Sequence, residues 1–184
     1  MPSAPGAARS LVDAVRGVAE KAAAAVGHRS PPVQQTLTVG RPPEEVAALW
    51  RDPAAVRQVL GDVGTVVVDR GAGAHGDRWT WRLVRPGSDE PVQWRTALAD
   101  GGVPRTLRWA DPDEGSERPA ELVVVLRDAP QGLGTEQVVR LDLPVPGLAA
   151  GAAALMLGYR ARALLLTGEV PTMTPQPAGR GRAR

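Results

Sequence analysis

The sequence lacks cysteine and phenylalanine and has only two histidines among its 184 residues. Without cysteine there are no disulfides, no thiolate metal ligands and no cysteine nucleophile. His28 and His75 stand far apart in segments rich in turn residues, and no cluster of acids accompanies either of them. General acid–base catalysis relies most often on histidine, and zinc sites need clustered ligands. We therefore predict no metal, no cofactor and no identifiable catalytic residue.

Long apolar runs are also missing, since no uninterrupted stretch reaches the roughly 18 apolar residues typical of a membrane-spanning helix. The N-terminus shows no secretory signal pattern, so we expect a cytoplasmic protein. The formal net charge is +2, and basic residues alternate with acids until three arginines gather near the end, Arg180, Arg182 and Arg184. A short basic tail is a poor nucleic-acid footprint, so no nucleic-acid partner is expected.

The first thirty residues predict a helix and a linker. Ser10 precedes Asp13 by three residues, a pattern typical of a helix start, and Gly27 follows as a stop. The apolar stripe between them consists of Leu11, Val15, Val18, Ala22 and Val26. This helix is expected to pack on its own domain or on a partner. Weak membrane-surface contact is the alternative, disfavoured because the segment has few basic residues and no aromatic anchors.

The next residues alternate and then break into helical pieces. Residues 33–39 carry apolar side chains at every second position, as a half-buried strand does. Pro42, Pro43 and the acids after them favour a helix start. Asp52 and Pro53 favour a second helix start, and Gly61 is the expected end of that helix. Two short helices are therefore expected after the first strand.

Six further strands are expected between residues 63 and 143. They cover residues 63–70, 77–85, 91–99, 105–111, 120–128 and 136–143, and segments rich in Gly, Pro, Asp or Ser separate them. The Gly-rich stretch GAGAHG, residues 71–76, lies between two of these strands and reads as a hairpin connection, since no helix follows it to bind phosphate. Asp142 is expected to point outward because it alternates with leucines.

A long helix is expected to close the chain after Pro146 and Gly147. Its predicted apolar stripe contains Leu148, Ala152, Leu155, Tyr159, Ala163 and Leu166. The order of elements favours an α+β domain in which a curved seven-stranded antiparallel sheet wraps around this helix. We divide the chain into an N-terminal helix and linker (1–32), this domain (33–169) and a flexible basic tail (170–184). Such a sheet leaves room for a cavity.

Two segments resemble the START-like superfamily, also called SRPBCC, of polyketide cyclases, dehydrases and lipid-transfer proteins. They are VGRPPEEVAALWRDPAAVRQVLGDV at 39–63 and LLLTGEVPTMTPQPAGRGR at 164–182. The likeness is greatest to a bacterial cyclase/dehydrase subgroup of unknown function and covers roughly residues 33–182. It implies a helix-grip fold and a small hydrophobic ligand, such as a lipid, an isoprenoid or a polyketide. No catalytic residue of the family falls on these motifs.

Four tryptophans lie in predicted strands, and two-residue spacing puts Trp79 and Trp81 on one face. If all four point inward, they either fill the core or wall a cavity. Tyr159 is the only tyrosine and is the best polar candidate on the closing helix. The predicted cavity lining is Trp79, Trp81, Trp94, Thr96, Trp109, Leu155 and Tyr159. Binding or transfer of a hydrophobic molecule is the leading hypothesis. The alternatives are a cyclase or dehydratase using Tyr159 or an arginine as acid, and a membrane-peripheral interaction protein that uses the N-terminal helix. The sequence leaves the oligomeric state open.

Overall fold

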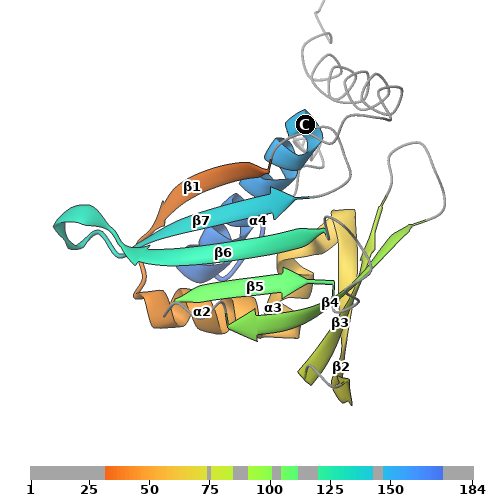
Figure 1. Ribbon diagram of the computed structural model, residues 1–184. Helices are drawn as coiled ribbons and strands as arrows, with labels where there is room; N and C mark the ends of the chain where they lie inside the picture. The colour runs from red at the N-terminus through yellow and green to blue at the C-terminus, as the bar shows by residue number, and fades with distance from the viewer. Residues whose placement is uncertain are drawn as a thin grey trace, which may run out of the picture.

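The computed structural model describes residues 32–73, 76–84, 91–100, 105–111, 120–142 and 147–171. These residues build one seven-stranded antiparallel sheet with helices packed against it (Figure 1). The α+β class predicted from the order of elements is therefore confirmed. The N-terminal helix, His28, His75 and the three arginines of the basic tail lie outside the described residues, so what was predicted for them stays a prediction.

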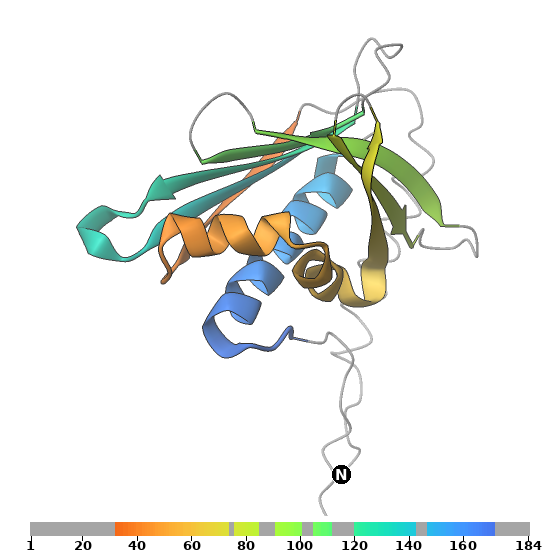
Figure 2. The same cartoon turned by 90° about the horizontal axis from the view of Figure 1, so that it is seen from below.

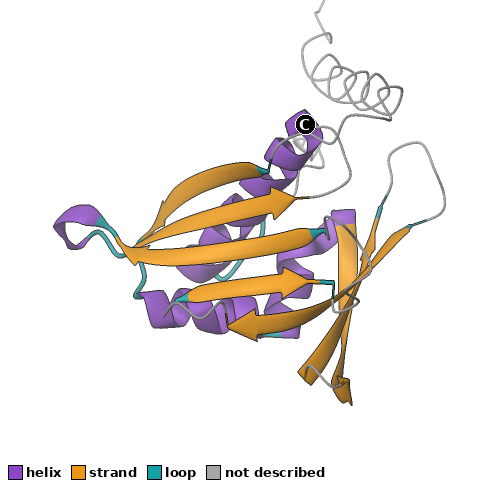
Figure 3. Cartoon of the chain, in the orientation of Figure 1, coloured by secondary structure: helices purple, strands orange, loops and turns teal. Residues whose placement is uncertain are grey.

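The strands and helices follow the predicted order, with bounds that differ by a few residues. Figure 3 distinguishes the strands from the helices. The strands are β1 (Val33–Val39), β2 (Gly64–Gly73), β3 (Gly76–Leu83), β4 (Val92–Asp100), β5 (Thr106–Ala110), β6 (Glu121–Asp128) and β7 (Thr135–Asp142). The α-helices are α2 (Pro43–Arg51), α3 (Pro53–Leu60) and α4 (Gly147–Thr167). Two single 3₁₀ turns, η1 (Gly61–Val63) and η2 (Pro130–Gly132), complete the described elements.

Asp52 joins the two short helices. Its backbone N–H donates to the carbonyls of Ala48 and Leu49 and so ends α2, while its side chain accepts the N–H of Ala54 at 2.9 Å and caps α3. Pro43 and Pro53 each occupy the first turn of their helix, where a missing N–H costs nothing. Gly61 ends α3 with a φ of +55°. The caps and prolines that predicted two short helices from the sequence are therefore the ones that form them.

The strand order is β1-β7-β6-β5-β4-β3-β2, so the chain runs as a meander from β2 to β7 and β1 is added beside β7. Figure 2 shows the sheet curving over α4, with α2 and α3 beside the helix on the same side. The buried core lies between this concave face and the three helices, and it includes Trp50 of α2, Val59 of α3 and Leu157 of α4.

Helix α4 turns a different face to the sheet from the predicted one. Its buried residues are Ala150, Ala154, Leu157, Gly158, Arg160 and Ala161, whereas Leu155 and Tyr159 are 48% and 49% exposed. The prediction that these two side chains face the sheet is wrong. Two glycines explain the choice of face: a Cβ on Gly158 would lie 2.5 Å from Cδ1 of Leu37, and one on Gly151 would lie 3.2 Å from Cγ1 of Val33. Strand β1 therefore packs so closely on α4 that only small residues fit between them.

Candidate functional site: an indole-lined interior and an adjoining groove

The strand tryptophans meet on the concave face of the sheet. Trp81 of β3 stands opposite Trp94 of β4, and Trp79 stands opposite Thr96. Trp109 of β5 stands opposite Leu98 of β4, two residues beyond Thr96, and therefore shares the same face. Trp79, Trp81, Trp109 and Thr96 are buried, and Trp94 is partly buried. Two-residue spacing accounts for the common face of Trp79 and Trp81, and the strand register adds Trp94 and Trp109 to it.

Helix α2 adds a fifth indole, Trp50, to this cluster. Its ring centroid lies 6.2 Å from that of Trp109. Trp109 in turn meets the edges of Trp79 and Trp81 at 5.7 Å and 6.3 Å, and Trp81 stacks on Trp94 at 5.6 Å. Offset-stacked and edge-to-face pairs at such separations are the favourable arrangements for aromatic rings. We call Trp50, Trp79, Trp81, Trp94 and Trp109 the indole cluster.

The N–H groups of the indole cluster fall into two sets. Trp50 donates to Oε1 of Gln137 at 2.8 Å, and Trp81 donates to the hydroxyl of Thr96 at 2.9 Å. The Nε1 atoms of Trp79, Trp94 and Trp109 are buried without a hydrogen-bond acceptor among the described residues. Buried donors in native proteins nearly always have a partner. Three such donors in one cluster point to an acceptor that the described residues do not supply.

Gln137 and Arg160 hold the helices in place around this interior. Gln137 accepts from Trp50 and donates from Nε2 to the backbone carbonyl of Gly158 at 3.3 Å, so it ties α2 and α4 to β7. Arg160 reaches from α4 to the C-terminal end of α3, where it donates to the carbonyls of Val59 and Leu60 at 3.4 Å and 2.6 Å. Sequence reasoning missed both residues. A polar side chain at an inward position of a strand, and one of two arginines in an otherwise apolar helix, were the available signals.

Arg160 also forms an ion pair with Asp62, whose side chain is largely exposed. The hydrogen bond that the guanidinium donates, helped by its charge, holds the pKa of the Asp62 carboxyl below its ordinary value of 3.8, while partial burial opposes the shift. The guanidinium is thus hydrogen bonded to the end of α3 and to η1. It is not a free acid facing the indole cluster.

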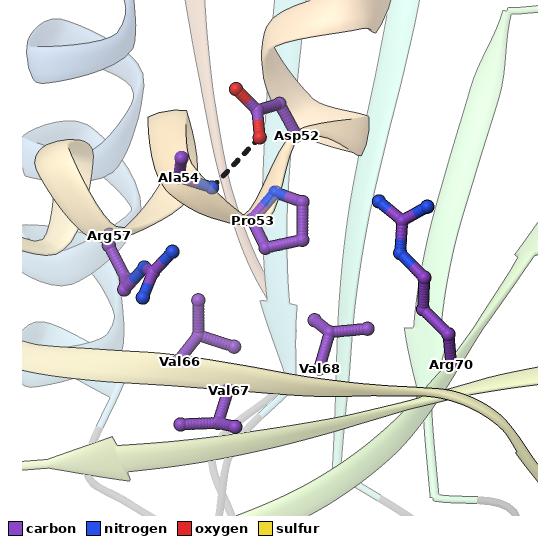
Figure 4. A pocket seen from close by; sticks show the side chains of 8 residues that line it. All are labelled: Asp52, Pro53, Ala54, Arg57, Val66, Val67, Val68 and Arg70. Carbon is purple, nitrogen blue, oxygen red and sulfur yellow. Dashed lines mark hydrogen bonds between the residues drawn. The ribbon is translucent and has the colours of Figure 1, made fainter.

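A groove opens between the start of α3 and strand β2, next to the indole cluster. It has a volume of about 300 Å³, and its lining residues are Asp52, Pro53, Ala54, Arg57, Val66, Val67, Val68 and Arg70 (Figure 4). Val66 stands opposite Trp81 and Val68 opposite Trp79 in the sheet register. The floor of the groove therefore continues the face that carries the indole cluster, and Figure 4 shows Val66 and Val68 pointing toward α3.

Several solved structures of small bacterial proteins share this architecture. A Deinococcus radiodurans protein is 22% identical with a TM-score of 0.55, over 75% of this chain and 99% of its own. A Chromobacterium violaceum protein is 16% identical with a TM-score of 0.56, over 73% and 97% of the two chains. The AHSA1-like protein from Aeromonas hydrophila is 12% identical with a TM-score of 0.53, over 79% and 100%. The shared fold is the helix-grip fold. At these identities the likeness shows the fold alone.

Sequence comparison adds nothing to this structural likeness, because no family model and no curated protein matches the chain. In the described ranges no helix is long and apolar enough to cross a membrane. The same ranges contain no group of three or more His, Asp or Glu side chains placed to hold a metal ion.

The predicted lining residues are thus divided between two places. The tryptophans and Thr96 come together in the interior, whereas Leu155 and Tyr159 lie on the face of α4 turned away from it. Asp142, predicted to point outward, is only 7% exposed. Val138, on the same face of β7, is buried as well, whereas Arg140 between them is exposed, so this face is covered in part and alternation along it does not indicate exposure.

Proposed function

We propose that this protein binds a small, largely apolar molecule that carries a hydrogen-bond acceptor, held between the sheet and the helices against the indole cluster. The observation that carries the proposal is the set of three buried indole N–H groups, of Trp79, Trp94 and Trp109, that lack an acceptor among the described residues. Leaving such a donor unpaired costs about 1–3 kcal/mol, so an acceptor brought by a ligand would gain affinity from each donor it reaches.

The chemistry of the interior limits what kind of molecule fits. Indole rings and valines offer large apolar contact area, and small-molecule sites combine such walls with a few polar groups that orient the ligand. The unpaired groups are all donors, so the matching ligand presents carbonyl, carboxylate, ether or hydroxyl oxygen. Fatty acids and other lipids, oxygenated isoprenoids and polyketide-like molecules present such oxygen on an apolar body, in agreement with the START-like resemblance.

The groove beside α3 supports a route for such a molecule. Its floor, Val66 and Val68, borders Trp81 and Trp79 directly. Arg57 and Arg70 line the same groove, and both side chains are exposed. A ligand passing between α3 and β2 would meet apolar floor first and the indole cluster behind it.

The candidate acids of the cyclase or dehydratase alternative do not face the indole cluster. Tyr159 is half exposed on the far side of α4, and Arg160 is hydrogen bonded to the end of α3. A general acid must lie within hydrogen-bond reach of the group it protonates. No observation on the described residues favours a reaction, so binding or transfer is the function we propose.

The test is to look for a ligand and then to supply one. Native mass spectrometry of the purified full chain would reveal a bound small molecule as added mass that denaturation removes. In parallel, calorimetric titration with 1,4-naphthoquinone, naphthalene and a long-chain fatty acid covers flat and extended apolar shapes, with and without acceptor oxygen. We expect added mass or saturable binding of at least one oxygen-bearing compound. Absence of both, in protein that unfolds cooperatively, would refute the proposal.

A further inference from the structure

Helix α4 carries large apolar side chains on the face turned away from the sheet. Leu155, Tyr159 and Leu166 are 48%, 49% and 40% exposed, and Ala152 is exposed in line with them. Their spacing places all four on one side of the helix. Isolated apolar residues on a surface are ordinary, but several aligned on one side of a helix favour an interaction surface. We call Ala152, Leu155, Tyr159 and Leu166 the outer stripe.

The packing of β1 shows why the outer stripe is not needed for the sheet. The glycines Gly151 and Gly158 lie so close to Val33 and Leu37 that a Cβ on either would contact those side chains at 3.2 Å and 2.5 Å. The buried side of α4 is therefore built mainly from glycine and alanine, together with Leu157 and Arg160. Large apolar side chains on the opposite side contribute nothing to that contact, so only another apolar surface could remove them from water.

We propose that residues 11–26 of the same chain form the helix that covers the outer stripe. Leu11, Val15, Val18, Ala22 and Val26 recur at helical spacing, and the opposite side of that helix would carry Asp13, Arg16 and Glu20. From Leu11 to Val26 a helix rises about 22 Å, and from Ala152 to Leu166 about 21 Å. The two apolar stripes therefore match in length.

The connection to β1 sets the direction of this helix. Val33 lies beside Gly151, so the chain enters the sheet next to the first turns of α4. Residues 27–32 span at most about 20 Å, which places Val26 over the Ala152 end of the outer stripe. The segment then runs antiparallel to α4, with Leu11 near Leu166 and Val18 opposite Tyr159. This arrangement is independent of what the indole cluster binds.

Paired cysteines test the contact and its direction together. The chain has no cysteine of its own, so Val18→Cys with Tyr159→Cys gives the full-length protein only two thiols. A short bis-maleimide should join them within one chain, seen by intact mass as a single added linker. The matched pair Val26→Cys with Leu166→Cys lies about 20 Å apart in the proposed arrangement, so each thiol should react alone. Equal linkage in both pairs, linkage in the second pair only, or linkage only between two chains would overturn the proposal.

Proteolysis provides a second measurement that needs no cysteines. Arg16 and Lys21 are trypsin sites within the covering segment. We expect cleavage there to be about tenfold faster in full-length Tyr159→Asp than in the unchanged protein, because the charge weakens the contact and the segment opens more often. Leu133→Asp, at a position 60% exposed in the β6–β7 connection, is the matched control and should cleave at the unchanged rate.

Two results of the proteolysis would contradict the proposal. One is equal cleavage of the unchanged protein and of Tyr159→Asp. The other is protection that appears only when anionic phospholipid vesicles are added, which would make a membrane surface the occupant of the segment's apolar side. Tryptophan fluorescence during thermal unfolding reports whether each variant is folded, since the indole cluster lies in the core and the substituted side chains are half exposed.

Discussion

The guanidinium of Arg160 donates to the backbone carbonyl of Leu60 at 2.6 Å, across a separation of 100 residues. Arg160 is 3% exposed although it carries a charge, and its bonds satisfy carbonyls at the end of α3 that have no partner within the helix. Asp62 supplies the countercharge. A single side chain thus fixes the C-terminal helix against the helix that borders the groove.

Replacing Arg160 by methionine should therefore destabilise the fold. The substitution keeps the apolar stem but leaves buried carbonyls without a donor, so we expect a loss of about 2–4 kcal/mol in the free energy of unfolding. Urea denaturation followed by tryptophan fluorescence measures it. Arg95→Met, at an exposed position of β4, is the control and should change stability by less than about 0.5 kcal/mol. Equal midpoints for the two variants would contradict the role given to Arg160.

Asp62 should make the stability fall in acid. Its pKa is lowered in the folded protein by the hydrogen bond from Arg160, so its contribution is complete above the ordinary value of 3.8 and is lost as the pH falls through the lower folded pKa. Urea denaturation at a series of pH values between about 6 and 2 should show a shallower acid-side decline in Asp62→Asn than in the unchanged protein. A steeper decline in Asp62→Asn would reverse the sign argued here.

Gly134 should tolerate no side chain. It has a φ of +101°, and a Cβ there would lie 2.3 Å from the carbonyl oxygen of Val39, a backbone atom that cannot rotate away. Gly134→Ala should cost more than about 2 kcal/mol, whereas Gly132→Ala should cost only the roughly 1 kcal/mol of an unfavourable φ. Gly132 also has a positive φ, but nothing lies within 4 Å of its Cβ position. Thermal unfolding of both variants separates the clash from the backbone strain.

The features that could be predicted from the sequence are those fixed by neighbours along the chain. Asp52 with Pro53 predicts the break between two helices, and two-residue spacing places Trp79 and Trp81 on one face. The features that could not be predicted depend on distant residues. Helix α4 is apolar nearly all round, so spacing alone offers two stripes, and the choice between them is made by Val33 and Leu37 of β1 packing against its glycines.

The candidate site also combines features set by neighbouring residues with features set by distant ones. The positions of the indole rings followed from strand alternation, but which of their N–H groups have acceptors did not. Gln137, which accepts from Trp50, is 87 residues away from it in sequence. No residue near Trp50 in the sequence indicates that Gln137 is its hydrogen-bond partner. The unpaired donors, on which the proposed function depends, are therefore visible only once the sheet and helices are assembled.

The indole donors themselves give the sharpest prediction about binding. 1,4-Naphthoquinone and naphthalene share a ring skeleton, but only the quinone has acceptor oxygens. Because the chain has no cysteine, it lacks the thiol that would add most readily to a quinone. If the quinone accepts from the indole cluster, Trp109→Phe should weaken its binding by about five- to tenfold while leaving naphthalene binding nearly unchanged. Trp50→Phe removes a ring of the same size whose N–H already bonds to Gln137, so it should affect both compounds alike. Isothermal calorimetry measures the six affinities, of both compounds for the unchanged protein and the two variants. A parallel loss of both compounds in Trp109→Phe would mean that ring packing, and not the N–H, holds the ligand.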